Sequence, residues 1–303
     1  MSLQRIIGTV FLICGLTYGI IFLFSVFKKT PKEDCELTSE SEKNLPAYKK
    51  ESGNLKLLFL LEGAVFFLCT LGISDFLLNT LIVKKLKLSE DRYLPSCLLA
   101  STIVPGSIIA FSYLKSDNII DSLTLTVYIV CLAIGSFLGS KVVSKMNNAT
   151  IKKVLGICLI LSMIALIAKM IVSAGASGTL TGLRGPKLVL LGVLCLLIGF
   201  INMMGVPMKP PTTAALLLIG FSPITALTLL LVMGVINPVF GSIQVAKEAK
   251  YNKKMVLAAM TTGTAFAILG VALAVSLDPT VLNIILLAVM ALAVYTILKP
   301  EKK

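Results

Sequence analysis

The chain of 303 residues is 56% hydrophobic and 14% charged, and its mean hydropathy is +0.95. A soluble domain of this size cannot bury so much apolar surface, so the composition excludes an ordinary soluble protein. The formal net charge of +13 does not indicate a nucleic-acid partner, because the lysines cluster in short segments between apolar runs. We therefore expect an all-α polytopic membrane protein in contact with the lipid bilayer. The apolar runs lack the alternation typical of β-barrel strands.

The first apolar run, Ile6–Phe27, is flanked on both sides by basic residues. It is longer than the apolar part of a typical signal peptide, and no A-x-A cleavage site follows it. We therefore predict a retained transmembrane helix within residues 1–27. Residues 28–56 are polar and mixed in charge, which is typical of a solvated linker, here expected in the cytoplasm.

Two sets of apolar runs follow, and each set has one long run and then three of ordinary length. The first set, residues 57–172, and the second, residues 188–298, are separated by a loop at 173–187, and a basic tail follows at 299–303. The runs are Leu57–Val83, Tyr93–Leu114, Leu123–Val143 and Val154–Val172, then Leu188–Gly220, Ile224–Ala246, Met255–Leu277 and Val281–Leu298. Most of these runs have about the 20 residues that a membrane-spanning helix requires.

The two sets share residues at a constant offset in the sequence. The matching pairs include Gly72 and Gly205, Thr80 and Thr213, and Pro105 and Pro238. Because glycine and proline constrain the backbone, their recurrence favours an internal structural repeat, as found in many transporters.

The distribution of charge indicates how the repeats are oriented. If each long run enters the membrane and returns to the same side, most of the 28 Lys and Arg lie on one side. If each long run crossed once, basic loops would fall on both sides, against the positive-inside rule. We therefore predict two inverted four-element helical repeats with broken, re-entrant first helices. In a cell membrane the N-terminus is then expected outside and the C-terminus in the cytoplasm.

The second long run is interrupted by GVPMKPPTT, from Gly205 to Thr213. Proline is unfavourable inside a helix but favourable in its first turn, so the prolines predict that one helix ends and another begins here. A broken helix at membrane depth is tolerated only inside protein or beside a water-filled cavity. The positive end of the new helix, with Lys209 and the hydroxyls of Thr212 and Thr213 nearby, predicts a site for an anion.

The matching stretch of the first long run is GISDFLLNT, which contains Asp75, Asn79 and Thr80. If the repeats are inverted, the two breaks meet near the membrane midplane and their polar side chains surround one cavity. Two alternatives stay open. Asp75 could form a purely structural ion pair with Lys209, and Lys209 could instead extend to the membrane surface. The threonines could simply bond the preceding helical turn.

Two other polar residues are candidates for the site. Asn237 precedes a kink predicted at Pro238 and could offer its amide to a ligand. Asp75 is the first candidate for a coupling proton and Glu62 is the second, because ionisable groups in the membrane are costly and usually functional. Glu62 lies near the start of its run, so a solvated position at the helix end is the alternative interpretation.

Several kinds of chemistry lack the residues that they require. Histidine is absent, which excludes His-ligated zinc and a Ser-His-Asp triad. The seven cysteines show no C-x-x-C spacing and most lie in apolar runs, so no metal or cofactor is expected. The chain has no P-loop motif, so transport would depend on a solute or ion gradient and not on ATP hydrolysis by this chain.

Three features of the sequence point to one family. They are the duplicated layout over about Leu57–Leu298, the stretch GVPMKPPTTAALLLIGFSPITA (Gly205–Ala226), and the stretch AIGSFLGSKVVSKMNNATIKKVLGICLIL (Ala133–Leu161) with a weaker copy ending in Gly270. In these the chain resembles the sulfite exporter TauE/SafE family, also called the 4-toluene sulfonate uptake permeases. The resemblance implies a permease for small sulfur-containing or organic anions.

The first break, GISDF, departs from the glycine cluster with a nearby proline that is common in that family. A cation- or proton-coupled carrier of another small solute is therefore an alternative to an anion carrier. A membrane scaffold without transport and an intramembrane enzyme using Asp75 or Lys209 are further alternatives. The enzyme would require a second convergent group, and the chain has few intramembrane candidates. We expect a transporter with a small anionic solute as its partner and a homo-oligomer as one possible assembly.

Overall fold

The computed structural model describes residues 3–27, 51–88, 94–115, 120–143, 178–204, 208–248 and 251–276. Gly205, the predicted runs Val154–Val172 and Val281–Leu298, the tail 299–303 and most of the linker lie outside these ranges. The described residues form helices, with one isolated backbone bridge between Leu180 and Phe221.

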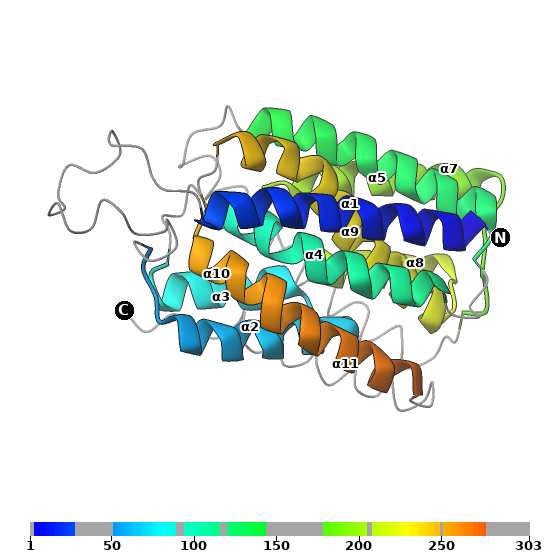
Figure 1. Cartoon of the computed structure of the whole chain (residues 1–303). Helices are drawn as coiled ribbons and strands as arrows, with labels where there is room; N and C mark the ends of the chain where they lie inside the picture. The colour runs from blue at the N-terminus through cyan, green and yellow to red at the C-terminus, as the bar shows by residue number, and fades with distance from the viewer. Residues whose placement is uncertain are drawn as a thin grey trace, which may run out of the picture.

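The helices follow one another as α1 (Leu3–Phe27), α2 (Leu55–Thr70), α3 (Asp75–Lys85), α4 (Leu94–Lys115), α5 (Ser122–Val143), α7 (Pro186–Asn202), α8 (Lys209–Ile219), α9 (Pro223–Glu248), α10 (Lys253–Ala258) and α11 (Thr264–Ser276). A short π-helical segment, η5 (Ala259–Gly263), joins α10 to α11 (Figure 1).

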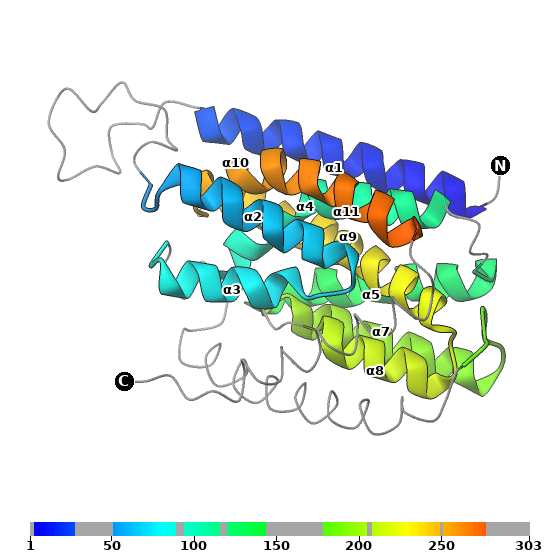
Figure 2. The ribbon, with the colours of Figure 1, turned by 90° about the horizontal axis from the view of Figure 1, so that it is seen from below.

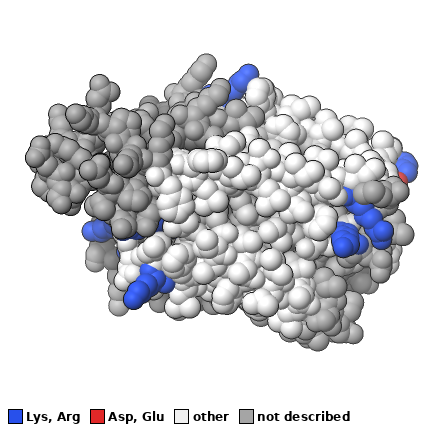
Figure 3. All heavy atoms as spheres, in the orientation of Figure 1, with Lys and Arg blue, Asp and Glu red and all other residues white. Residues whose placement is uncertain are grey.

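Five spans among the described helices are long and apolar enough to cross a membrane. They are Leu3–Phe27, Leu94–Lys115, Ser122–Val142, Pro223–Gly241 and Lys253–Leu273. On the face in Figure 3, the Lys and Arg side chains lie toward the two ends of the molecule, and the surface between them is uncharged. The prediction of an all-α, multi-pass membrane protein is therefore confirmed.

Each of the two long apolar runs contains two helices. Gly72, between α2 and α3, has a φ of 86°, which L side chains rarely adopt, and Ser74 then caps α3 by accepting a hydrogen bond from the Leu77 amide. In the second run α8 begins at Lys209 with Pro210 and Pro211 directly after it, as the prolines predict. Glycine and proline at these positions therefore decide where the helices end and begin.

Both helix pairs return to the end of the molecule from which they start. The Ser52 hydroxyl, just before α2, donates to the carbonyl of Leu88, just after α3, over 3.1 Å. At the other end, the amide of Leu180, before α7, donates to the carbonyl of Gly220, after α8, over 3.1 Å. Figure 2 shows α2 and α3 running side by side and joined by a turn.

The two ends differ in their polar contacts. We call the first the lysine-rich end; its described basic residues are Lys56, Lys84, Lys85, Lys87, Lys141, Lys253 and Lys254. There the Asn252 side-chain amide donates to the carbonyls of Ser52 and Leu88 over 3.2 and 3.0 Å, which joins the start of α10 to α2 and α3.

At the opposite end the Arg184 guanidinium binds both carboxylate oxygens of Asp121, over 2.6 and 2.7 Å. Hydrogen bonds from Arg184, and then from Thr124, hold the pKa of the Asp121 carboxyl well below its usual value. The Thr124 hydroxyl also accepts from the Leu183 amide over 2.8 Å. These contacts attach the segment before α7 to the start of α5.

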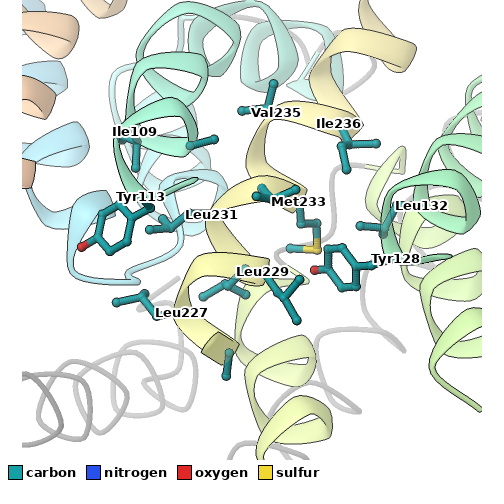
Figure 4. Packing of buried hydrophobic residues seen from close by; sticks show 14 of the residues in the cluster. Ile109, Tyr113, Tyr128, Leu132, Leu227, Leu229, Leu231, Met233, Val235 and Ile236 are labelled. Carbon is teal, nitrogen blue, oxygen red and sulfur yellow. The ribbon is translucent and has the colours of Figure 1, made fainter. Parts of the chain in front are cut away.

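Helices from the first half of the chain pack mainly against helices from the second half. At the centre α4 packs against α9, and each contains an internal proline, Pro105 and Pro238. α5 packs against α7, while α2 packs against α10, η5 and α11. In Figure 4, apolar side chains of α9 lie between those of α4 and α5.

Glycines permit the closest of these contacts. A side chain at Gly135 or Gly139 on α5 would collide with the backbone carbonyls of Leu196 or Phe200 on α7. The GSFLGS stretch therefore serves helix packing, as small residues commonly do in membranes. The N-terminal helix α1 packs on α4 in a similar way through Gly15.

Candidate functional site

The first residues of α3 and α8 form an ion pair in the interior of the protein. The Lys209 Nζ atom lies 2.6 Å from the Asp75 Oδ1 atom, and the two side chains are 6% and 0% exposed. The residues that the sequence predicts at the two breaks are thus in direct contact.

Neighbouring groups fix both members of the pair. The Thr102 hydroxyl of α4 donates to the Asp75 Oδ2 atom over 2.6 Å. The Lys209 ammonium lies 2.9 Å from the Cys69 sulfur and 3.5 Å from the carbonyl oxygen of Ile73. Groups from α2, the α2–α3 turn, α3 and α4 therefore converge on the first residue of α8.

The helix dipoles affect the two charges differently. The positive end of α3 stabilises the Asp75 carboxylate, whereas the positive end of α8 is unfavourable for the Lys209 ammonium. Two positive sources therefore coincide at the start of α8. A buried positive region of this kind requires a negative partner, and in this state the partner is Asp75.

A small cavity adjoins the ion pair. Its volume is about 10 Å³, and its lining contains Ser74, Asp75, Phe76, Asn202, Met208, Lys209, Met233, Gly234, Asn237 and Pro238. This is room for about one water molecule. The Asn202 Oδ1 and Asn237 Nδ2 atoms are buried and have no hydrogen-bond partner among the described residues. The cavity thus offers one unused acceptor and one unused donor beside a cation.

A second polar cluster lies nearer the lysine-rich end. Glu62 of α2 is 0% exposed, and its Oε2 atom lies 3.4 Å from the Asn79 side-chain amide of α3. The same amide lies 3.5 Å from the hydroxyl of Ser101 on α4. The alternative of a solvated Glu62 at the helix end is wrong, because the side chain is buried and contacts Asn79 of α3.

The other sequence candidates divide into three groups. Thr80, Thr212 and Thr213 bond the carbonyls of the preceding helical turn over 2.6–2.8 Å and do not line the cavity. Asn79 belongs to the Glu62 cluster. Asn237 lines the cavity, and its Oδ1 atom accepts from the Ser136 hydroxyl over 2.6 Å. Lys209 does not extend to the surface, since it is buried and paired with Asp75.

Several residues of the site were missed in the sequence. Thr102 and Ser101 bind Asp75 and Asn79, and Asn202 lines the cavity. The signal for Asn202 was available, because an amide inside a long apolar run is costly unless it has a partner or a function. The hydroxyls of α4 gave no such signal, since serine and threonine in membrane helices usually bond their own helix.

No protein-family model, curated protein or solved structure matches the chain. Its class is therefore defined by the fold, which is that of an integral, multi-pass membrane protein. Among the residues that the structure describes, no group of three or more His, Cys, Asp or Glu side chains could hold a metal ion.

Proposed function

We propose that this protein is a secondary transporter of a small, sulfur-containing or organic anion, in the manner of the TauE/SafE permeases that its sequence resembles. The observation that carries the proposal is Lys209, a buried cation at the positive end of α8 beside a polar cavity. An oxyanion suits such a place, because both the ammonium and the helix end favour negative charge.

The arrangement of the helices supports two inverted repeats. In this reading α2 and α3 correspond to α7 and α8, α4 to α9, and α5 to α10 with α11. Under this correspondence the contact of α5 with α7 is equivalent to the contact of α10 and α11 with α2, because each joins the last helix of one repeat to the first helix of the other. The two helix pairs return to opposite ends of the molecule, as inversion requires.

In this state Asp75 occupies the place that the anion would take beside Lys209. Its carboxylate is chemically similar to a small anionic solute, so the solute would compete with Asp75 for the ammonium. The unpartnered Nδ2 atom of Asn237 would then donate a hydrogen bond to an oxygen of the solute. Because the cavity holds about one water molecule, α3 and α8 must separate before a solute can enter.

The proposal predicts saturable uptake of one anion class by the purified protein in liposomes. A panel of sulfite, thiosulfate, short sulfonates and small carboxylates is offered to protein-containing and empty vesicles. An anion that binds the folded state also stabilises it, by about 2.7 kcal/mol at a concentration of 100 Kd. Absence of both uptake and stabilisation across the panel would contradict the proposal. Uptake of a cation in the same assay would instead favour the alternative, a cation carrier, because the buried carboxylate of Asp75 suits a cation.

The lysine-rich end is proposed to face the cytoplasm, by the positive-inside rule. A cysteine is introduced at Lys85 or at Lys187, which lie at opposite ends, in a variant without native cysteines. The cysteine of Lys187→Cys is expected to react with an impermeant thiol reagent added to intact cells. The cysteine of Lys85→Cys is expected to react only after the cells are opened. The reverse pattern would overturn the orientation, and with it an N-terminus outside the cell.

A further inference from the structure

Glu62 is a fully buried carboxyl group in the membrane-spanning region, and no basic side chain among the described residues pairs with it. Its Oε1 atom has no hydrogen-bond partner among the described residues, and its Oε2 atom has only the long contact to Asn79. The Oδ1 atom of Asn79 likewise has no hydrogen-bond partner in the described part of the chain. An ionised carboxylate would therefore lie in a nonpolar interior almost without compensation, which costs several kcal/mol.

The charges of the neighbouring groups lead to the same conclusion. Among the residues that the structure describes, α2 and the elements packed against it or bonded to it contain these ionisable groups besides Glu62: Lys56, Cys69, Asp75, Lys84, Lys85, Cys97, Tyr113, Lys115, Lys253 and Lys254. Lys209 lies beside Cys69. The basic ones other than Lys209 lie at the ends of their helices, and Lys209 is already neutralised by Asp75. The buried cluster is therefore neutral only if Glu62 is an uncharged acid.

We infer that Glu62 is a proton-binding site of this protein, protonated in the state described here, and that it exchanges protons between the lysine-rich end and Asp75. Glu62 lies about two turns after the start of α2, about 10 Å from that end along the helix. Asn79 lies one turn after Asp75 on the same side of α3, and it bridges Glu62 and Ser101. The cluster thus lies between the ion pair and the lysine-rich end.

The transfer balances as a movement of one proton. The O–H bond of Glu62 breaks, an O–H bond forms on a carboxylate oxygen of Asp75, and Glu62 is protonated again from the lysine-rich end. Asp75 then releases the proton on the opposite side together with the anion, and its carboxylate pairs with Lys209 again. Neutral Asp75 no longer pairs with Lys209, so the ammonium can bind one anionic charge. This coupling rests on the proposed anion transport and predicts one proton moved with each monovalent anion. The protonation of Glu62 itself does not depend on the transported solute.

A bound sodium ion is a less suitable occupant than a proton. Sodium is held by a shell of several oxygen atoms, whereas this cluster provides the side chains of Glu62, Asn79 and Ser101. A proton requires one acceptor, which the unpartnered Asn79 oxygen can provide when the amide is flipped, so that the oxygen takes the place of the nitrogen.

Infrared spectroscopy of the purified protein tests the protonation directly. At neutral pH we expect the carbonyl stretching band of a buried, protonated carboxylic acid, absent in Glu62→Gln and retained in Glu51→Gln, a matched change at the lysine-rich end. The Asn79→Ala variant should shift the band, because the acid loses its nearest partner. Absence of the band, or its persistence in Glu62→Gln, would overturn the inference. Sodium-dependent stabilisation without the band would assign the site to sodium instead.

Liposomes loaded with a pH-sensitive dye test the coupling. In the wild-type protein, anion uptake should acidify the lumen, with one proton for each monovalent anion. Glu62→Gln should lose proton movement and anion uptake together, because Asp75 then receives no proton and stays paired with Lys209. Adding Asp75→Asn to this variant frees Lys209 without a proton and should restore exchange of labelled for unlabelled anion. Full proton movement in Glu62→Gln would overturn the coupling role. If no anion is transported at all, the transport proposal fails while the infrared result still decides the protonation of Glu62.

Discussion

Lys209→Ala is expected to abolish anion uptake and to lower the free energy of unfolding by about 3–5 kcal/mol. The substitution removes the cation of the proposed anion site and leaves the Asp75 carboxylate buried with the Thr102 hydroxyl as its remaining close partner. Uptake is measured in liposomes after reconstitution, and stability in detergent by thermal or denaturant unfolding. Wild-type uptake in this variant would remove Lys209 from the transport site.

A double variant separates the two effects of this substitution. Lys209→Ala combined with Asp75→Asn has no buried charge at the site, so most of the lost stability should return. Uptake should stay absent, because the anion still lacks its cation. Lys187→Ala is the matched control, since it removes an exposed lysine from the start of α7. It should match the wild type in both measurements.

Asp75→Asn is expected to have the opposite effect on anion binding. Lys209 loses its partner, so the protein without a ligand should be destabilised, again by about 3–5 kcal/mol. An anion that takes the vacated place beside Lys209 should then stabilise this variant more than it stabilises the wild type. Because no proton is required to release Lys209, anion binding should also lose its dependence on pH. Thermal shift titrations at several pH values measure both quantities.

Asp121→Asn is the control for the loss of an acidic partner outside the membrane region. Arg184 lowers the pKa of Asp121 in the folded protein, so this carboxylate stabilises the fold above its ordinary pKa of about 4 and loses that contribution as the pH falls below it. The variant should therefore be less stable at neutral pH and less sensitive to acid. Its anion-induced stabilisation should match the wild type. Equal anion responses in Asp75→Asn and the wild type would contradict competition between Asp75 and the solute.

The chain itself determined the class of the protein and the ends of its helices. Apolar runs of membrane-spanning length, separated by short basic segments, predicted a multi-pass helical protein, and the described spans agree. Gly72 and the prolines after Lys209 act on their own backbone, so their effects could be predicted locally. The same local reasoning placed Lys209 beside the start of a helix and Asp75 in the matching break of the first long run.

Tertiary structure decided which polar groups meet. Helices that are apolar on most sides show no clear buried face in the sequence, so the pairing of Thr102 with Asp75 had no local signal. Glu62 was misjudged for the same reason, because its distance from the helix end suggested solvent while its side chain is buried and contacts Asn79 of α3. The energy of a buried charge depends on groups far away in the chain. Only the packing of the helices brings those groups within a few ångströms and determines which charges are compensated.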